Sequence, residues 1–295
     1  MTTERTPTRT LATYLAFVKF EHTLFALPFA YAGMTIAAQG WPGTATFTWI
    51  TLAMVGARTA AMAINRVVDA DIDAANPRTA DRDIPVGRLQ RRDGLILAVL
   101  AVTLLIVSGI ALNPLTATLL PVALVFLVAY PWTKRFTWAC HLWLGVTIGA
   151  AAAGGSIAVT GTFDVAAILL WIAVGTWIAG FDVIYALLDH AFDVAHGVHS
   201  IPARFGARRA IDISAGLHLV SVAAMLALPA VTPLGLPYLL IVAGTVLPLL
   251  VMQQVLVRRR GVTAALTAFN ANLWISALVL LAVVLDVALP IGLRW

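Results

Sequence analysis

The chain has few charged residues and almost no cysteine. Only 11% of its 295 residues are Asp, Glu, Lys or Arg, whereas a soluble protein carries roughly a quarter. The deficit extends along the whole length, and 61% of the residues are hydrophobic, which excludes a soluble domain with a single membrane anchor. The lone cysteine, Cys140, excludes an intrachain disulfide and a cysteine-cluster metal site. We therefore expect an all-α, polytopic protein that is integral to a lipid bilayer.

Nine apolar segments are candidates for membrane-spanning helices, each of which needs about 20 apolar residues. They cover residues 11–38, 44–68, 93–112, 114–132, 138–160, 165–190, 208–230, 234–257 and 263–289. No polar block or linker between them is long enough to separate two domains, so residues 1–295 are expected to form one intramembrane domain. The first segment is too long for a signal peptide and contains Lys19, Glu21 and His22.

The basic residues predict an orientation in the membrane. Cytoplasmic loops attract Lys and Arg, and 17 of the 19 basic residues fall on one side if the N-terminus is cytoplasmic; Arg58 and Arg294 are the exceptions. The 17 are Arg5, Arg9, Lys19, Arg66, Arg78, Arg82, Arg88, Arg91, Arg92, Lys134, Arg135, Arg204, Arg208, Arg209, Arg258, Arg259 and Arg260. This asymmetry accounts for the net charge of +5 without a nucleic-acid partner.

Two of the helices that run towards the predicted cytoplasmic side end in polar stripes, which are sets of three polar residues spaced four residues apart. The stripes are Asn65, Asp69 and Asp73, and Tyr185, Asp189 and Asp193. Each step of four residues turns about 40° around a helix, so the members of a stripe share one face, whereas Asp71 points away. Facing carboxylates repel one another unless a cation lies between them, and magnesium takes one or two carboxylates together with phosphate oxygens. The stripes therefore predict two magnesium ions bridged by a diphosphate.

Side chains in the neighbouring loops suit the diphosphate, because guanidinium groups pair well with phosphate oxygens. The candidates are Arg78, Arg82, Lys134, Arg135, Ser200 and Arg204, with Tyr185 from the second stripe. One stripe alone would more often be a solvated helix end, but two matched stripes favour a functional site. Solvated loop or helix-start charges are expected at Asp71, Asp81, Asp83 and Asp93, and the Cys140–His141 pair is interpreted as packing.

Two charges lie deeper in the predicted helices. Arg58 precedes Asn65 by seven residues, and Asp182 precedes Asp189 by seven, which puts each on the face of its stripe and about 10 Å further into the membrane. Ionisable residues at such depth face a cavity or pair with each other. Arg58 and Asp182 either line an inner cavity, where Arg58 could hold an acidic aromatic substrate, or form an ion pair between the helices.

The stripes resemble the two motifs of the UbiA superfamily of intramembrane prenyltransferases. The first motif, NRxxDxxxD, stands at residues 65–73, and the second, YxxxDxxxD, stands at 185–193. The resemblance implies nine transmembrane helices around a central cavity, with polar caps on the cytoplasmic side. It also implies magnesium-dependent transfer of a polyprenyl chain from its diphosphate to an acceptor.

The same resemblance implies roles for the candidate residues. Asn65 and the carboxylates of Asp69, Asp73, Asp189 and Asp193 would hold the metals, and the basic residues would hold diphosphate. The allylic cation left by diphosphate departure would be steadied by the aromatic faces of Tyr130, Phe181 or Tyr185.

Further stretches resemble the 4-hydroxybenzoate branch of the superfamily, namely 18–29, 75–80, 130–138 and 188–206. Glu21–His22 resembles bacterial members assigned to menaquinone synthesis by the futalosine route. The expected acceptor is 4-hydroxybenzoate or a dihydroxynaphthoate, in ubiquinone or menaquinone biosynthesis at a bacterial inner membrane. The alternatives are a non-aromatic acceptor and a cation-coupled transporter; transporters, however, bind their substrates near the bilayer midplane, and basic loops would repel a cation.

Overall fold

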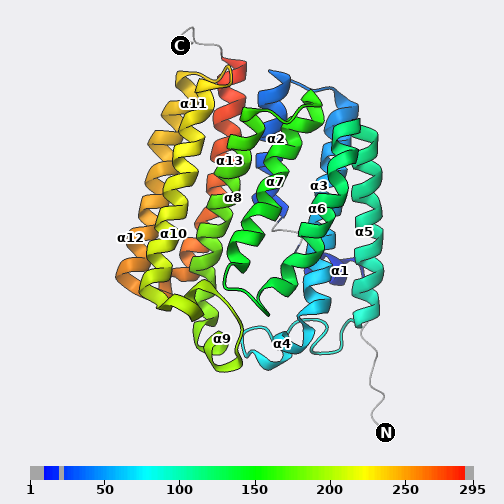
Figure 1. The fold of residues 1–295 in the computed structure, drawn as a ribbon, viewed down its shortest axis with the longest axis vertical. Helices are drawn as coiled ribbons and strands as arrows, with labels where there is room; N and C mark the ends of the chain where they lie inside the picture. The colour runs from blue at the N-terminus through cyan, green and yellow to red at the C-terminus, as the bar shows by residue number, and fades with distance from the viewer. Residues whose placement is uncertain (1–9, 20–22, 290–295) are drawn as a thin grey trace.

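The computed structural model describes residues 10–19 and 23–289, which contain helices and no strands (Figure 1). The long bundle is built from α1 (Leu11–Phe17), α2 (Thr23–Ala38), α3 (Thr44–Val68), α5 (Arg91–Leu112), α6 (Pro114–Thr133), α7 (Cys140–Thr160), α8 (Val165–Ala186), α10 (Ile201–Ala227), α11 (Leu236–Ile241), α12 (Leu247–Arg260) and α13 (Ala265–Ala288). In the described chain, seven stretches are long and apolar enough to cross a membrane, one of which spans 236–288. The predicted all-α membrane architecture is confirmed.

The first predicted segment is not one helix. Helix α1 ends at Phe17 and α2 begins at Thr23, and Lys19 has a left-handed backbone conformation with φ of 50°. A right-handed helix cannot continue through such a residue, so the prediction of one helix over residues 11–38 was wrong. Several residues used in the sequence predictions lie outside the described part of the chain, namely Arg5, Arg9, Glu21, His22 and Arg294.

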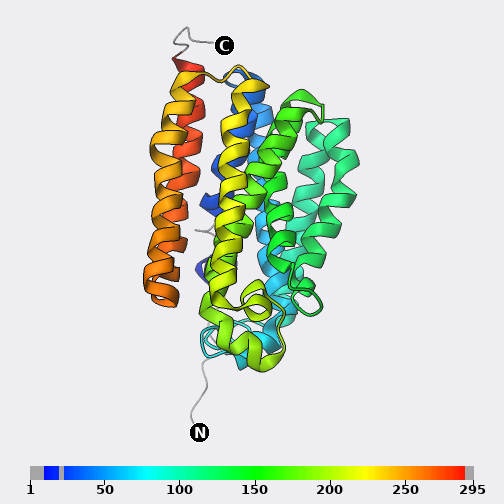
Figure 2. The same ribbon diagram turned by 60° about the vertical axis from the view of Figure 1, so that its left-hand side comes forward.

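The two ends of the bundle differ in their connections. At the end that holds the C-terminus, the turns are short, and Asn113 alone joins α5 to α6 (Figure 1). The Asn113 side chain accepts a hydrogen bond from the Thr116 backbone N–H and donates to the Ile157 carbonyl at 2.8 Å, which ties this turn to α7. At the opposite end, α4 (Ala70–Ala75), η2 (Leu187–Asp189) and α9 (His190–His196) form a polar cap with their loops (Figures 1 and 2).

Small residues set the spacing of the central helices. A Cβ atom on Gly145 of α7 would lie 2.3 Å from the Gly175 carbonyl oxygen of α8, and one on Gly155 would lie 2.1 Å from the Ala30 oxygen of α2. Such close approach is typical of membrane helices, which gain no hydrophobic free energy by leaving lipid for each other. The largest packed core, around Trp177 and Tyr238, lies among α2, α8 and α10–α13. The packed half therefore supports α7 and α8, whose other sides face a cavity.

Candidate active site

A cavity of about 670 Å³ lies beneath the polar cap and extends along the bundle. Its deep wall is apolar and includes Leu112, Leu119 and Trp171 near the far end of the helices. Its mouth is lined by polar residues of both predicted stripes, which are Asn65, Asp69, Asp73, Tyr185, Asp189 and Asp193. Phe181, Tyr130, Arg58 and Asp182 line the same cavity. Segments more than 100 residues apart in the sequence thus contribute to one site.

The stripes keep their common faces although each passes through a helix break. Asp69 lies between α3 and α4 with φ of −91° and ψ of 3°. The Asp69 N–H nevertheless donates to the Asn65 carbonyl at 2.9 Å, and the Asp73 N–H donates to the Asp69 carbonyl at 2.8 Å. Because this i to i−4 pattern survives, the side chains remain in register. Asp71 points outward, with a side chain 84% exposed, and pairs with Arg91.

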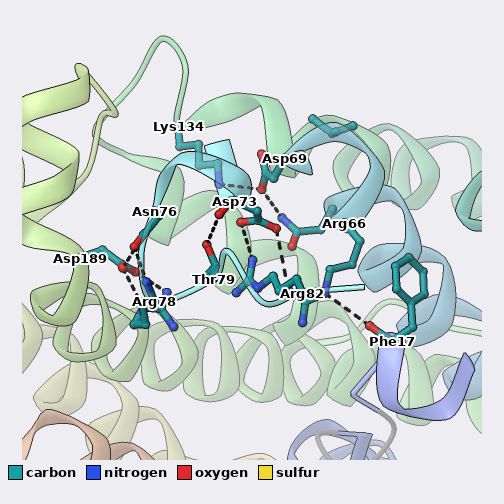
Figure 3. Close-up of polar contacts among 12 residues, drawn as sticks. Phe17, Arg66, Asp69, Asp73, Asn76, Arg78, Thr79, Arg82, Lys134 and Asp189 are labelled. Atoms are coloured by element: carbon teal, nitrogen blue, oxygen red, sulfur yellow. Dashed lines mark hydrogen bonds and ion pairs between the residues drawn. The ribbon is translucent and has the colours of Figure 1, made fainter. Parts of the chain in front are cut away.

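The first arm is defined as Asn65, Asp69 and Asp73. Its two carboxylates are buried, and cationic side chains contact both (Figure 3). Lys134 Nζ lies 2.6 Å from Asp69 Oδ2, and an Arg135 terminal nitrogen lies 3.1 Å from Asp69 Oδ1. Arg135 also donates to the Val68 carbonyl at 2.8 Å, at the end of α3, where the helix dipole favours a cation. Asn65 donates to Asp69 at 2.6 Å. The end of α6 therefore clamps the junction of α3 and α4.

The second carboxylate of this arm holds the cap loop. Arg82 donates to Asp73 Oδ1 at 2.6 Å, and Thr79 donates to the Asp73 carbonyl at 3.0 Å. Asp73 Oδ2 is buried and has no hydrogen-bond donor among the described residues; a terminal nitrogen of Arg66 lies 4.0 Å from it. A buried carboxylate oxygen in this state has capacity for another ligand.

The second arm, defined as Tyr185, Asp189 and Asp193, is held by Arg78 from the loop that follows the first arm; Figure 3 shows Arg78 beside Asp189. The Arg78 Nε donates to Asp189 Oδ1 at 2.7 Å, and one terminal nitrogen donates to the Tyr185 hydroxyl at 2.9 Å. Burial disfavours the guanidinium charge, but the hydrogen bonds to Asp189 and Tyr185 and the negative charge of Asp189 outweigh it and raise the pKa of Arg78. Arg78 therefore stays a cation and ties the second arm to the loop that follows the first.

Two neutral groups complete the second arm. Asn76 donates to Asp189 Oδ1 at 2.9 Å, and the Ser200 hydroxyl donates to Asp193 Oδ2 at 2.8 Å. The Ser200 oxygen also accepts from the Ala203 N–H, so it caps α10. Ser200 thus links the second arm to the start of the long helix α10.

The structure departs from the sequence interpretation at two positions. Arg204 lies exposed in α10 and is not among the described residues that line the cavity, so the structure does not bring it together with the other diphosphate-binding candidates. His141, interpreted as packing, lines the cavity and places Nδ1 2.7 Å from Asp182 Oδ2. The sequence left open whether Asp182 pairs with Arg58; the structure gives it an imidazole partner.

Asn76 and His141 were missed as candidates because their contacts are not local patterns. Asn76 reaches Asp189 over 113 positions, and His141 reaches Asp182 over 41. The available signals were slight: Asn76 follows the first stripe by one helical turn, and His141 lies at the inner end of an apolar helix.

Taken together, the fold and the cavity define a multi-pass membrane protein with an acidic and basic cap over an apolar chamber. The sequence model of the UbiA prenyltransferase family matches residues 26–289. The 4-hydroxybenzoate octaprenyltransferase of Alkalilimnicola ehrlichii is 34% identical over 261 residues, covering 87% of each chain. That of Pseudoalteromonas translucida is 31% identical over 266 residues, covering 88% of this chain and 89% of the relative.

Solved structures agree with the family match. A UbiA homologue from Aeropyrum pernix, solved in its apo form, superposes with a TM-score of 0.82 at 33% identity and covers 90% of this chain and 98% of its own. An Archaeoglobus fulgidus UbiA homologue bound to GPP and Mg²⁺ has the same fold, with a TM-score of 0.73 at 16% identity, covering 94% of this chain and 100% of its own. The chain belongs to the UbiA prenyltransferase family, and it is a polyprenyltransferase rather than a transporter.

Proposed function

We propose that the protein transfers a polyprenyl group from polyprenyl diphosphate to an aromatic acid, 4-hydroxybenzoate or a dihydroxynaphthoate, in a magnesium-dependent reaction of quinone biosynthesis. The observation that carries this proposal is the meeting of four carboxylates and several cations at the mouth of a long apolar cavity. The relatives named 4-hydroxybenzoate octaprenyltransferase support the aromatic acceptor. Transfer to a non-aromatic acceptor is the alternative within the family.

The residues present fit a magnesium site that is shared with diphosphate. Among the described residues, no three His, Cys, Asp or Glu side chains gather closely enough to hold a metal by themselves, which suits an ion that takes remaining ligands from phosphate and water. The buried Asp73 oxygen without a donor supports ligation there. The metal ligands would be Asn65, Asp69, Asp73, Asp189 and Asp193. When bound, magnesium would neutralise negative charge that develops on the leaving diphosphate.

The basic residues of the cap would bind the diphosphate directly. In this structure the carboxylates of the two arms pair with four cations, which are Lys134, Arg135, Arg82 and Arg78. The side chains of these cations are 25–32% exposed at the cavity mouth. Charge-assisted hydrogen bonds to phosphate oxygens are strong and short, so these cations can exchange a carboxylate for diphosphate as the substrate enters. The Tyr185 and Ser200 hydroxyls are further donors beside them.

The wall of the cavity would receive the remaining parts of the two substrates. The prenyl tail would lie along the apolar wall, and the rings of Tyr130, Phe181 and Tyr185 would stabilise the allylic cation. Arg58 of α3 would bind the acceptor carboxylate, and Asp182 lies in the same lining. Exclusion of water by the apolar wall would protect the cation from hydrolysis.

The proposed membrane arrangement has nine transmembrane segments in one domain over residues 1–295, with the N-terminus and the polar cap on the cytoplasmic side of a bacterial inner membrane. Two features support it. The stretch 236–288 consists of two rods side by side, α11–α12 and α13 (Figure 2). The cap end also carries most of the basic residues, which is typical of the cytoplasmic side.

The first test is product formation by the purified protein in detergent. A labelled polyprenyl diphosphate would be supplied with 4-hydroxybenzoate or a dihydroxynaphthoate, with and without magnesium. Magnesium-dependent prenylation of either acceptor is expected and would identify the pathway. No transfer to either acceptor, with metal-dependent diphosphate binding intact, would reject the aromatic acceptors and favour a non-aromatic one.

A further inference from the structure

One carboxylate in the cavity wall, Asp182, has a histidine as its partner. The Asp69, Asp73 and Asp189 side chains each contact an Arg or Lys side chain. Asp182, deeper in α8, instead contacts the His141 ring, with 2.7 Å between Nδ1 and Oδ2. The carboxylate can only accept, so Nδ1 carries the proton of this hydrogen bond. This pair needs a function that a metal and diphosphate site does not provide.

The two members of the pair differ in their access to the cavity. The Asp182 side chain is 25% exposed, whereas the His141 side chain is 5% exposed. His141 Nε2 is buried and has no hydrogen-bond partner among the described residues. The carboxylate is therefore the group that a cavity ligand can touch, and the imidazole lies behind it and fixes its orientation.

The backbone spacing that allows this contact is built into the helices. Gly145, one turn after His141, lies against Gly175, and a Cβ there would also come within 3.0 Å of the Ala179 Cβ. A larger residue at position 145 would push α7 away from α8 and lengthen the bond between His141 and Asp182. The glycine contact and the His–Asp contact lie on the same helix pair, which gives the pair a rigid support.

We propose that His141 is the positioning residue of a His–Asp pair in which Asp182 accepts the hydroxyl proton of the aromatic acceptor. The proposal rests on the proposed function and adds a residue to it. A carboxylate held in one orientation by a histidine is an effective proton acceptor. Removal of the hydroxyl proton makes the acceptor ring more electron-rich at the adjacent carbon, where the prenyl group must be added.

With 4-hydroxybenzoate as the acceptor, the C1–O bond of the prenyl diphosphate breaks first, and its electron pair leaves with diphosphate. The ring carbon next to C–O then forms a bond to the C1 cation as the hydroxyl proton passes to Asp182. The ring carbon then loses its proton to the diphosphate, and Asp182 returns its proton to the oxygen, which restores the aromatic phenol.

The test compares two substitutions at one position. In His141→Asn, the side-chain amide places an N–H near the position of Nδ1, whereas His141→Leu removes the donor and keeps an apolar side chain. We expect His141→Leu to lower kcat with 4-hydroxybenzoate by about 10²-fold, the lower range for loss of acid–base catalysis, with the KM for polyprenyl diphosphate unchanged. His141→Asn should recover most of this loss.

A second acceptor distinguishes proton transfer from a structural effect. 3-Fluoro-4-hydroxybenzoate has a more acidic hydroxyl and needs less help to lose its proton, so the kcat ratio of wild type to His141→Leu should shrink with it. An equal ratio for both acceptors would overturn the proposal. So would wild-type turnover by His141→Leu, or an equal loss in the Asn and Leu variants. If the wild type prenylates neither hydroxybenzoate nor a dihydroxynaphthoate, the proposed function itself fails, and the variants are not needed to show it.

Discussion

The two acidic arms have the same spacing but balance their charge differently. In the first arm, Asp69 is 1% exposed and Asp73 is 4% exposed. Cations at the end of α6 contact Asp69, and a cation of the cap loop contacts Asp73. In the second arm, the Asp189 side chain is 17% exposed and has one cationic partner, Arg78, among the described residues, while the hydroxyl of Ser200 contacts Asp193. The first arm is therefore more fully compensated in this structure.

The difference shows that one loop serves both arms. Arg78 and Arg82 lie four residues apart after α4, and they contact Asp189 and Asp73 respectively. The second arm thus depends on the loop that follows the first arm, whereas the first arm also has its own clamp from Lys134 and Arg135. The sequence spacing determines where the carboxylates lie, and the loop after α4 supplies cations to both arms.

The largest expected effect comes from removing one carboxylate of either arm. Asp69→Ala and Asp189→Ala should each lower kcat/KM by on the order of 10²–10³-fold, the range for loss of one electrostatic group at a reacting centre. Both variants should stay folded, because the cations left behind are 26–32% exposed and can turn to water. The measurement is steady-state prenylation together with thermal unfolding in detergent.

Asp71→Ala is the matched control, since Asp71 lies between the two carboxylates of the first arm in sequence but points outward. It should keep activity within about twofold of wild type, as surface substitutions usually change little. Near-normal turnover by Asp69→Ala or Asp189→Ala would remove that arm from the proposed metal site. A large loss in Asp71→Ala would show that overall acidity, not the stripe, matters.

A smaller effect is expected when the bridge that Arg78 makes from the loop after α4 to the second arm is altered. Arg78→Lys keeps the charge but loses the planar fork that contacts Asp189 and Tyr185 together. We expect about a tenfold loss of kcat/KM, measured with saturating acceptor. The high pKa of Arg78 keeps it charged at working pH, so substitution is the way to break the bridge.

Arg82→Lys provides the comparison for Arg78→Lys. Arg82 makes one contact with Asp73, from a terminal nitrogen to Oδ1 at 2.6 Å, and a lysine can replace a single contact better than a fork. Its loss should be several-fold smaller. If the two variants lose equal activity, Arg78 is acting as a point charge and does not hold the second arm by its geometry.

The sequence predicted the carboxylates well because their periodicity is local. Asp69, Asp73, Asp189 and Asp193 line one cavity, as the four-residue spacing implied, since the backbone hydrogen bonds continue through the break at Asp69. The partner of each carboxylate was less predictable. Arg204 was predicted to bind diphosphate because it is an arginine close to the second stripe, but it does not line the cavity. The direction of a side chain at a kinked helix start depends on tertiary packing, which the local sequence does not determine. Gly206, with φ of 78° and ψ of 161°, marks that kink.

The smallest effect on activity is expected for a buried carboxylate outside both arms. Asp286 of α13 is 7% exposed and accepts hydrogen bonds from the Gly235 and Tyr238 N–H groups at 3.0–3.1 Å, so it caps the start of α11 at the end away from the site. Asp286→Ala should leave these donors unpaired and cost about 1–3 kcal/mol of stability, seen as a lower Tm. Activity below the transition should stay within about twofold of wild type, because the cavity mouth lies at the opposite end. A loss of turnover without a fall in Tm would contradict this and would mean that burial of a carboxylate in this bundle, rather than membership of an arm, determines its importance to catalysis.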